Sequence, residues 1–211
     1  MAAQSAQSAQ AVQSRDTFLL LPITIDSTTK DITNLSHDPL LSRELEALNN
    51  LHRSLKQPPI TDGVPPPPVP VHPHRTAMIE KMRNTGNAAF RKQNYREAID
   101  LYTHAIQMAL TRPGWEPAPL LRDELQQLYS NRAQAHIGIN NWPEGLADAN
   151  CSIEFKKAGN QKAHWRKCKC LKEMGRLEEA RDGLEYGLEF GTDPELSNML
   201  KEVQDMLDRR Q

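Results

Sequence analysis

Residues 128–144 read LYSNRAQAHIGINNWPE, and comparing this stretch with the sequence on either side of it predicts the fold. Its small residue Ala133 has a counterpart 47 residues earlier, Gly86, and another 35 residues later, Cys168. Small side chains allow two antiparallel helices to approach closely. The pattern therefore predicts three similar units, each built from a pair of helices.

A second series of small residues repeats both intervals, and a turn signal precedes each member. The members are Ala98, Gly145 and Ala180, and the signals are Tyr95-Arg-Glu97, Trp142-Pro-Glu144 and Leu177-Glu-Glu179. The longer first interval places an insertion around residues 111–121, TRPGWEPAPLL. The pattern resembles the tetratricopeptide repeat, whose period is about 34 residues. This resemblance implies a mainly α fold, with three repeats forming a right-handed helical solenoid over residues 75–192.

A C-terminal cap helix is expected over residues 193–211, where Gly191 ends one helix and Asp193-Pro194 begins the next. One face of this helix is apolar and the other is charged, as the end of a solenoid requires. The apolar positions are Leu196, Met199, Leu200, Val203, Met206 and Leu207.

The N-terminal quarter of the chain has a different composition. Residues 1–15 are a low-complexity Ala/Gln/Ser run that we expect to be disordered. Residues 16–56 predict a small module, with a strand at FLLLPITID (18–26), a turn at STTKD (27–31) and a helix starting at Asp38-Pro39. The apolar edge at 18–25 could dock on a partner strand or pack on the first repeat. Residues 57–74 are a Pro-rich linker, or else a ligand for a proline-reading domain.

Composition excludes several classes of function. The chain has 211 residues and a net charge of −1, so its charge does not indicate binding to nucleic acid or to anionic lipid. The three cysteines, Cys151, Cys168 and Cys170, are expected to be reduced thiols of a cytosolic protein. The longest apolar stretch, residues 18–25, is far shorter than the ~20 residues of a membrane helix, and we expect no signal peptide. At a membrane, another subunit would have to hold this chain.

Five polar residues on the expected first helices of the repeats form the candidate binding site. Lys162 and Arg166 lie four residues apart and so share a helix face; Arg83 and Asn87 have the same spacing, and Asn131 lies between the two pairs. Singly, each could be an ordinary surface residue. Together, three cations and two amides favour a site for a small anion, most simply a peptide carboxylate.

These five residues match the two-carboxylate clamp of tetratricopeptide co-chaperones. The resemblance implies binding of the C-terminal Glu-Glu-Val-Asp tail of cytosolic heat-shock chaperones. Arg83 stands where the family usually has Lys, so the charge is kept but the geometry of donation changes. Upstream residues of the tail are expected to meet a secondary groove formed by Phe90, Gln134 and Lys169.

No catalytic apparatus is evident, and no cofactor or metal is expected. The alternative is an enzyme or metal protein using His164, Cys168 and Cys170. Core packing explains these residues better, because Cys168 occupies the small packing position of its repeat.

Two features indicate one family among the tetratricopeptide proteins that carry such a clamp. They are the Pro-Gly-Trp-Glu-Pro insertion at 113–117 and the order of module, linker, repeats and cap. Together they resemble the small tetratricopeptide subunit of the fungal endoplasmic reticulum post-translational translocation complex. This resemblance implies a peripheral protein on the cytosolic face of that membrane, held by a small single-span membrane subunit. It would receive seventy-kilodalton heat-shock chaperones that bring precursor proteins. A soluble cytosolic co-chaperone adaptor with the same clamp is the alternative.

Overall fold

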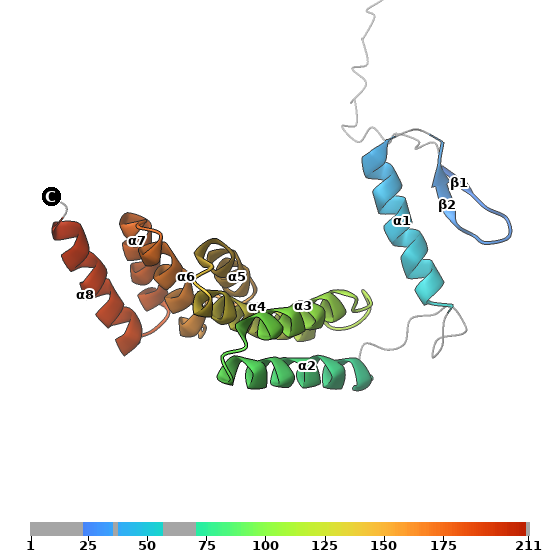
Figure 1. Ribbon diagram of the computed structural model, residues 1–211. Coiled ribbons are helices and arrows are strands. Elements are labelled where there is room, and N and C mark those ends of the chain that lie inside the picture. Colours follow the sequence, from blue (N-terminus) through green and yellow to red (C-terminus); the bar gives the residue numbers. More distant parts are fainter. Residues whose placement is uncertain (1–22, 36–37, 57–70, 210–211) are drawn as a thin grey trace, which may run out of the picture. The chain divides into compact units, whose positions relative to one another are not determined.

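The computed structural model describes residues 23–35, 38–56 and 71–209. The chain divides into two compact units, residues 1–65 and residues 66–211 (Figure 1). The expected disorder of residues 1–15, the first part of the expected strand and most of the Pro-rich linker lie outside the described residues. The finer domain boundaries therefore stay a prediction.

The first unit contains a short antiparallel hairpin. Strand β1 (Ile23–Ile25) pairs with strand β2 (Ile32–Asn34), with Thr24 opposite Thr33. In the turn, the Asp26 carboxylate accepts hydrogen bonds from the backbone N–H groups of Thr28 and Thr29, at 2.8 and 2.7 Å. These bonds, that of Thr29 foremost, lower the pKa of Asp26. The sequence predicted the first strand and the turn, but not the second strand.

Helix α1 (Pro39–Ser54) begins as predicted, with the Asp38 carboxylate accepting from the backbone N–H groups of Leu40 and Leu41. The helix is joined to β2 by the buried amide of Asn49. Its Oδ1 accepts from the Ile32 N–H and its Nδ2 donates to the Ile32 carbonyl, both at 2.8 Å. A single side chain thus satisfies both backbone groups of one residue on the strand.

The second unit is a stack of antiparallel helix pairs followed by a final helix, as the repeat pattern predicted (Figure 1). The pairs are α2 (His74–Arg91) with α3 (Tyr95–Leu110), α4 (Ala118–Gly138) with α5 (Trp142–Phe155), and α6 (Gln161–Glu173) with α7 (Leu177–Glu189). The tetratricopeptide fold is confirmed. No helix among residues 39–54 and 74–208 is both long enough and apolar enough to cross a membrane.

Each helix pair turns through one residue in the left-handed region of backbone conformation. These residues are Gln93, Asn140 and Gly175, with φ of 63°, 58° and 77°. They are separated by the same 47 and 35 residues as the small packing positions. Only the third repeat uses glycine, the residue that adopts this conformation without steric cost.

The predicted small residues do bring the helices together. Gly86, Ala133 and Cys168 are all buried, as are Ala98, Gly145 and Ala180. At Gly86 the approach is close, since an added Cβ would lie 2.7 Å from Cε1 of Tyr102 on α3. Any larger residue there would push the tyrosine ring away.

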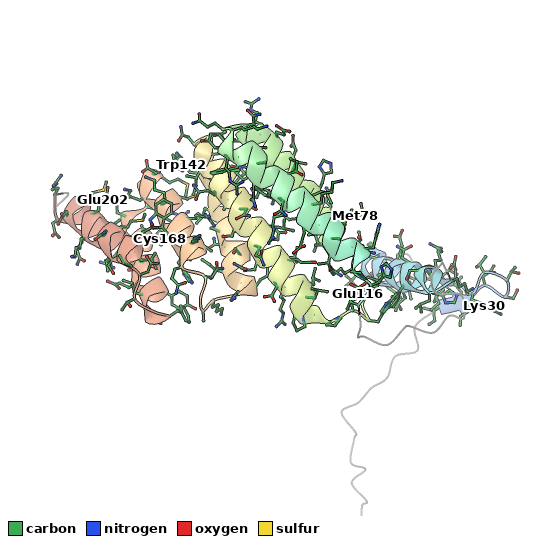
Figure 2. The ribbon with its side chains drawn as sticks, turned by 90° about the horizontal axis from the view of Figure 1, so that it is seen from below. Lys30, Met78, Glu116, Trp142, Cys168 and Glu202 are labelled. Atoms are coloured by element: carbon green, nitrogen blue, oxygen red, sulfur yellow. The ribbon has the colours of Figure 1, made fainter. Side chains whose placement is uncertain are left out.

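The insertion between the first two repeats is anchored by a buried arginine. Arg112 has a side chain only 2% exposed, and its guanidinium donates to both oxygens of Glu124, at 2.7 and 2.5 Å. It also pairs with Glu116 and donates to Thr76 Oγ1 on α2. Figure 2 shows Glu116 in the loop that precedes α4. The inserted loop is thereby tied to the first turn of α2 and the second turn of α4.

Helix α8 (Pro194–Asp208) ends the array as predicted. The Asp193 carboxylate accepts from the backbone N–H groups of Glu195 and Leu196, at 2.9 and 3.0 Å. Its apolar face is buried at three positions and partly buried at the other three. The six residues are Leu196, Met199 and Val203, then Leu200, Met206 and Leu207.

Substituting Gly175 by Ala tests the left-handed turn. We expect Gly175→Ala to lower the free energy of unfolding by about 1 kcal/mol, because a Cβ is strained at this φ. Gly114→Ala is the matched control, since nothing lies within 4 Å of its Cβ position and its φ is not in the left-handed region. Urea unfolding followed by circular dichroism measures both. Equal stabilities of the two variants would contradict the assignment.

Substituting Arg112 by Met tests the anchor of the insertion. The change leaves the carboxylates of Glu116 and Glu124 poorly solvated and without their cation. We expect the free energy of unfolding to fall by about 3 kcal/mol. Arg122→Met, at an exposed position on α4, is expected to change stability by less than about 0.5 kcal/mol. A similar loss in both variants would refute the anchoring role.

Candidate functional site

The five predicted site residues lie on α2, α4 and α6, the first helices of the three repeats. Helix α4 lies between the other two and contacts both of them. Residues on neighbouring first helices can therefore meet across the helix boundaries. The contacts of Asn131 with Asn87 and of Arg166 with Gln134 are of this kind.

Asn87 and Asn131 are in direct contact. The Asn131 Nδ2 donates to Asn87 Oδ1 at 3.2 Å, and the Tyr102 hydroxyl donates to the same oxygen at 2.7 Å. With its oxygen occupied by two donors, the Asn87 amide has its N–H groups left to offer a ligand. The arrangement suits an acceptor such as a carboxylate.

Tyr102 was missed by the sequence analysis. It lies on a second helix, at a position that the other two repeats fill with the buried apolar residues Ala149 and Leu184. The residue is 1% exposed, and burial raises its pKa. A hydroxyl at a position that is otherwise apolar is the signal that could have found it.

Arg166 is held by neutral partners. Its Nε donates to Gln134 Oε1 at 2.8 Å, and its Nη1 donates to Ser130 Oγ, both on α4. Among the described residues no carboxylate pairs with it, and burial lowers its pKa to about 10. The guanidinium is therefore still a cation at neutral pH, but it lacks a counter-ion.

The structure places Gln134 beside Arg166 as its hydrogen-bond acceptor, a more specific role than the secondary groove expected from the sequence. Ser130, the second partner, was not predicted. Both residues fix the plane of the guanidinium from the neighbouring helix. Oriented in this way, the guanidinium can give two parallel hydrogen bonds to one carboxylate.

Lys162 and Lys169 line the same cavity as Arg166. The cavity has a volume of about 600 Å³ and lies between α6 and α8, with Gln134 at its edge. Lys162 is exposed, whereas Lys169 is paired with Glu173 at 2.8 Å. Two of the three predicted cations of the clamp thus share one cavity.

Arg83 is directed elsewhere. Its Nη1 donates to Gln127 Oε1, its Nη2 lies 4.0 Å from a Glu80 oxygen, and its Nε is buried without a partner. It lines a smaller cavity of about 150 Å³ between α2 and α4. Burial raises the pKa of Tyr102, and the positive charges of Arg166, Arg91 and Arg83 oppose this shift.

Phe90 is packed rather than free. Its ring makes an edge contact with Tyr95, with the ring centroids 5.3 Å apart, and it lies against the core of the first repeat. The half-buried ring has limited surface to offer a peptide. Its place in the secondary groove stays a prediction.

The three residues of the metal alternative point to different neighbours. Cys168 faces Gly183 on α7, and Cys170 faces Gly145 on α5, since an added Cβ at either glycine would lie 3.0 Å from the sulfur. Burial raises the pKa of both thiols to about 12. His164 is stacked on Phe190, and its Nε2 lies 3.0 Å from the Lys157 carbonyl oxygen. Among the described residues, no three His, Cys, Asp or Glu side chains are placed to hold a metal ion.

Comparison with curated proteins gives a clear relative. The chain is 40% identical over 127 residues to the ER protein translocation subcomplex subunit sec67 of Schizosaccharomyces pombe, covering 59% of this chain and 66% of the relative. It is 31% identical over 133 residues to a protein SGT1 homolog of Oryza sativa, covering 63% of this chain and 32% of that protein. The matched region thus spans less than two thirds of these relatives' own lengths. No family model matches the chain.

Comparison with solved structures shows the same fold. A chain of the Sec complex from Saccharomyces cerevisiae aligns with a TM-score of 0.71 and 22% identity, covering 89% of this chain and 98% of that one. The first tetratricopeptide domain of Spaghetti, bound to the HSP90 peptide SRMEEVD, aligns with a TM-score of 0.52 and 24% identity, covering 63% and 94%. The resemblance of this chain to the small tetratricopeptide-repeat subunit of the fungal endoplasmic reticulum translocation complex is confirmed by its similarity to sec67 over 127 residues.

Proposed function

We propose that this protein is a non-catalytic docking receptor for the C-terminal Glu-Glu-Val-Asp tails of cytosolic heat-shock chaperones. Arg83, Asn87, Asn131, Lys162 and Arg166 would receive the two carboxylates of the terminal aspartate. The tail would come from chaperones of the seventy-kilodalton class, which would be recruited with precursor proteins to the translocation channel. The protein would act on the cytosolic face of the endoplasmic reticulum membrane.

The observation that carries this proposal is that, among the described residues, the Arg166 cation is bonded to neutral partners alone. Removing a guanidinium from water is costly, and Gln134 and Ser130 return only part of that cost. An incoming carboxylate would supply the missing counter-charge. Each charge-assisted hydrogen bond contributes about 1.5–3 kcal/mol, so affinities on the order of micromolar are expected after the tail has been ordered.

The comparisons support the same reading. A structural neighbour holds a peptide that ends in Glu-Glu-Val-Asp, and the fission yeast relative is named as a translocation subunit. The exposed apolar residues of the first unit support a partner-docking role for it. These residues include Ile25, Leu35 and Leu40, which are 64%, 69% and 67% exposed. The partner would be a small single-span membrane subunit.

Substituting Arg166 by Ala tests the proposal. With a fluorescent octapeptide ending in Glu-Glu-Val-Asp, fluorescence anisotropy should show at least a tenfold loss of affinity, because charge-assisted bonds are removed. Arg176→Ala is the matched control, since Arg176 is exposed on the solenoid and paired with Glu179. Circular dichroism checks that helicity is unchanged. If Arg166→Ala binds the peptide as tightly as the parent, the clamp assignment is wrong.

Substituting Tyr102 by Phe tests how Asn87 is positioned. The change removes the donor that fixes the Asn87 oxygen, so we expect the affinity for the same peptide to fall about threefold to tenfold. Tyr186→Phe, on the exposed surface of α7, should leave the affinity unchanged. Thermal unfolding of both variants accounts for lost stability. An unchanged affinity of Tyr102→Phe would remove the tyrosine from the site.

A further inference from the structure

The cap helix α8 does more than cover the end of the core. It forms one wall of the cavity of about 600 Å³ that also contains Arg166 and Lys162. Four residues of α8 line it: Glu195, Asn198, Met199 and Glu202. Figure 2 shows Glu202 on this helix, at the end of the array. Two residues of the candidate clamp, Lys162 and Arg166, therefore line the same cavity as the cap helix.

The lining of this cavity is mainly cationic. Lys162, Arg166, Lys169 and Lys172 follow one face of α6, whereas the carboxylates are those of Glu195 and Glu202 on α8. Trp165 and Met199 give it an apolar surface as well. Such a lining suits a segment with acidic side chains on aliphatic stems.

Lys172 is more enclosed than Lys169. Its side chain is 10% exposed, and its Nζ donates to Glu202 at 2.7 Å. Glu202 itself is 56% exposed, and the hydrogen bond from Lys172 lowers its pKa. A largely enclosed cation neutralised by a mostly exposed carboxylate has a counter-ion that another carboxylate could replace. Lys169 makes a comparable exposed pair with Glu173.

The spacing along α6 fits an extended peptide. A helix rises 1.5 Å per residue, so Arg166 and Lys172 are separated by roughly 9 Å along the axis. An extended chain advances about 3.3 Å per residue, so this distance corresponds to about three residues. A tail whose terminal carboxylate lies at Arg166 would bring the side chains two and three positions upstream near Lys169 and Lys172.

We propose that the cavity between α6 and α8 is a second subsite of the same receptor, which takes the two glutamate side chains upstream of the terminal aspartate. Lys169 and Lys172 are the recognising cations. Glu202 is a built-in competitor, which must give up Lys172 when the tail binds. The proposal rests on the proposed function, and it assigns part of the tail specificity to the cap helix.

Two fluorescent octapeptides, ending in Glu-Glu-Val-Asp and in Gln-Gln-Val-Asp, test the subsite by fluorescence anisotropy on the full chain. The parent should bind the first about tenfold more tightly. Lys172→Gln should remove most of this preference, with little effect on the second peptide. Glu202→Gln should do the opposite, tightening the first peptide about threefold by freeing Lys172. Lys201→Gln, at an exposed position of α8, is the control and should change neither affinity.

The outcomes separate the two proposals. Equal binding of both peptides by the parent, or equal losses of both in Lys172→Gln, would overturn the subsite and leave the clamp standing. Weaker binding of the first peptide by Glu202→Gln would also overturn it, because a competitor cannot strengthen binding. If the parent binds neither peptide, both the subsite and the proposed function are wrong.

Discussion

The contact between Gly86 and the ring of Tyr102 joins the fold to the candidate site. A Cβ at residue 86 would lie 2.7 Å from the ring, so the ring of Tyr102 can occupy its observed place against α2 only because this residue is glycine. The ring is buried by the approach, and its hydroxyl then reaches Asn87 on α2. Asn87 in turn accepts from Asn131 on α4. The packing of Tyr102 against Gly86 thus helps to position Asn87 and, through the hydrogen bond between the two asparagines, Asn131 on the first helix of the next repeat.

The asparagines and the arginines of the candidate site differ in how their side chains are held before a ligand binds. The two asparagines are held by each other and by a tyrosine, so their geometry is fixed before a ligand arrives. Arg166 is oriented by Gln134 and Ser130 but has no counter-ion among the described residues. Arg83 is bonded to Gln127 and would have to turn to reach a shared ligand. Preorganised amides beside one uncompensated cation favour binding of an anion, because little ordering remains to oppose it.

The repeats could be predicted from the sequence because the small residues that mark them recur at regular intervals. Small residues separated by 47 and 35 positions predicted the helix pairs, and Asp38 and Asp193 predicted two helix starts. Strand β2 was missed because it depends on Asn49, 17 residues away from Ile32. Arg112 was missed because a charged residue in a loop indicates surface, and its burial depends on partners from two helices. In the site, the residue types were predictable. The direction of Arg83 and the pairing of Lys172 with Glu202 were not, because both depend on contacts between helices.

The proposed function requires that the protein binds the tail peptide through its free C-terminal carboxylate. The most direct measurement compares a fluorescent octapeptide ending in Glu-Glu-Val-Asp with the same peptide carrying an amidated C-terminus, each titrated into the full chain. The account predicts binding on the order of micromolar for the free acid and at least a tenfold loss on amidation, because one carboxylate and its charge-assisted bonds are removed. Equal binding of the two peptides, or no binding of either, would contradict it.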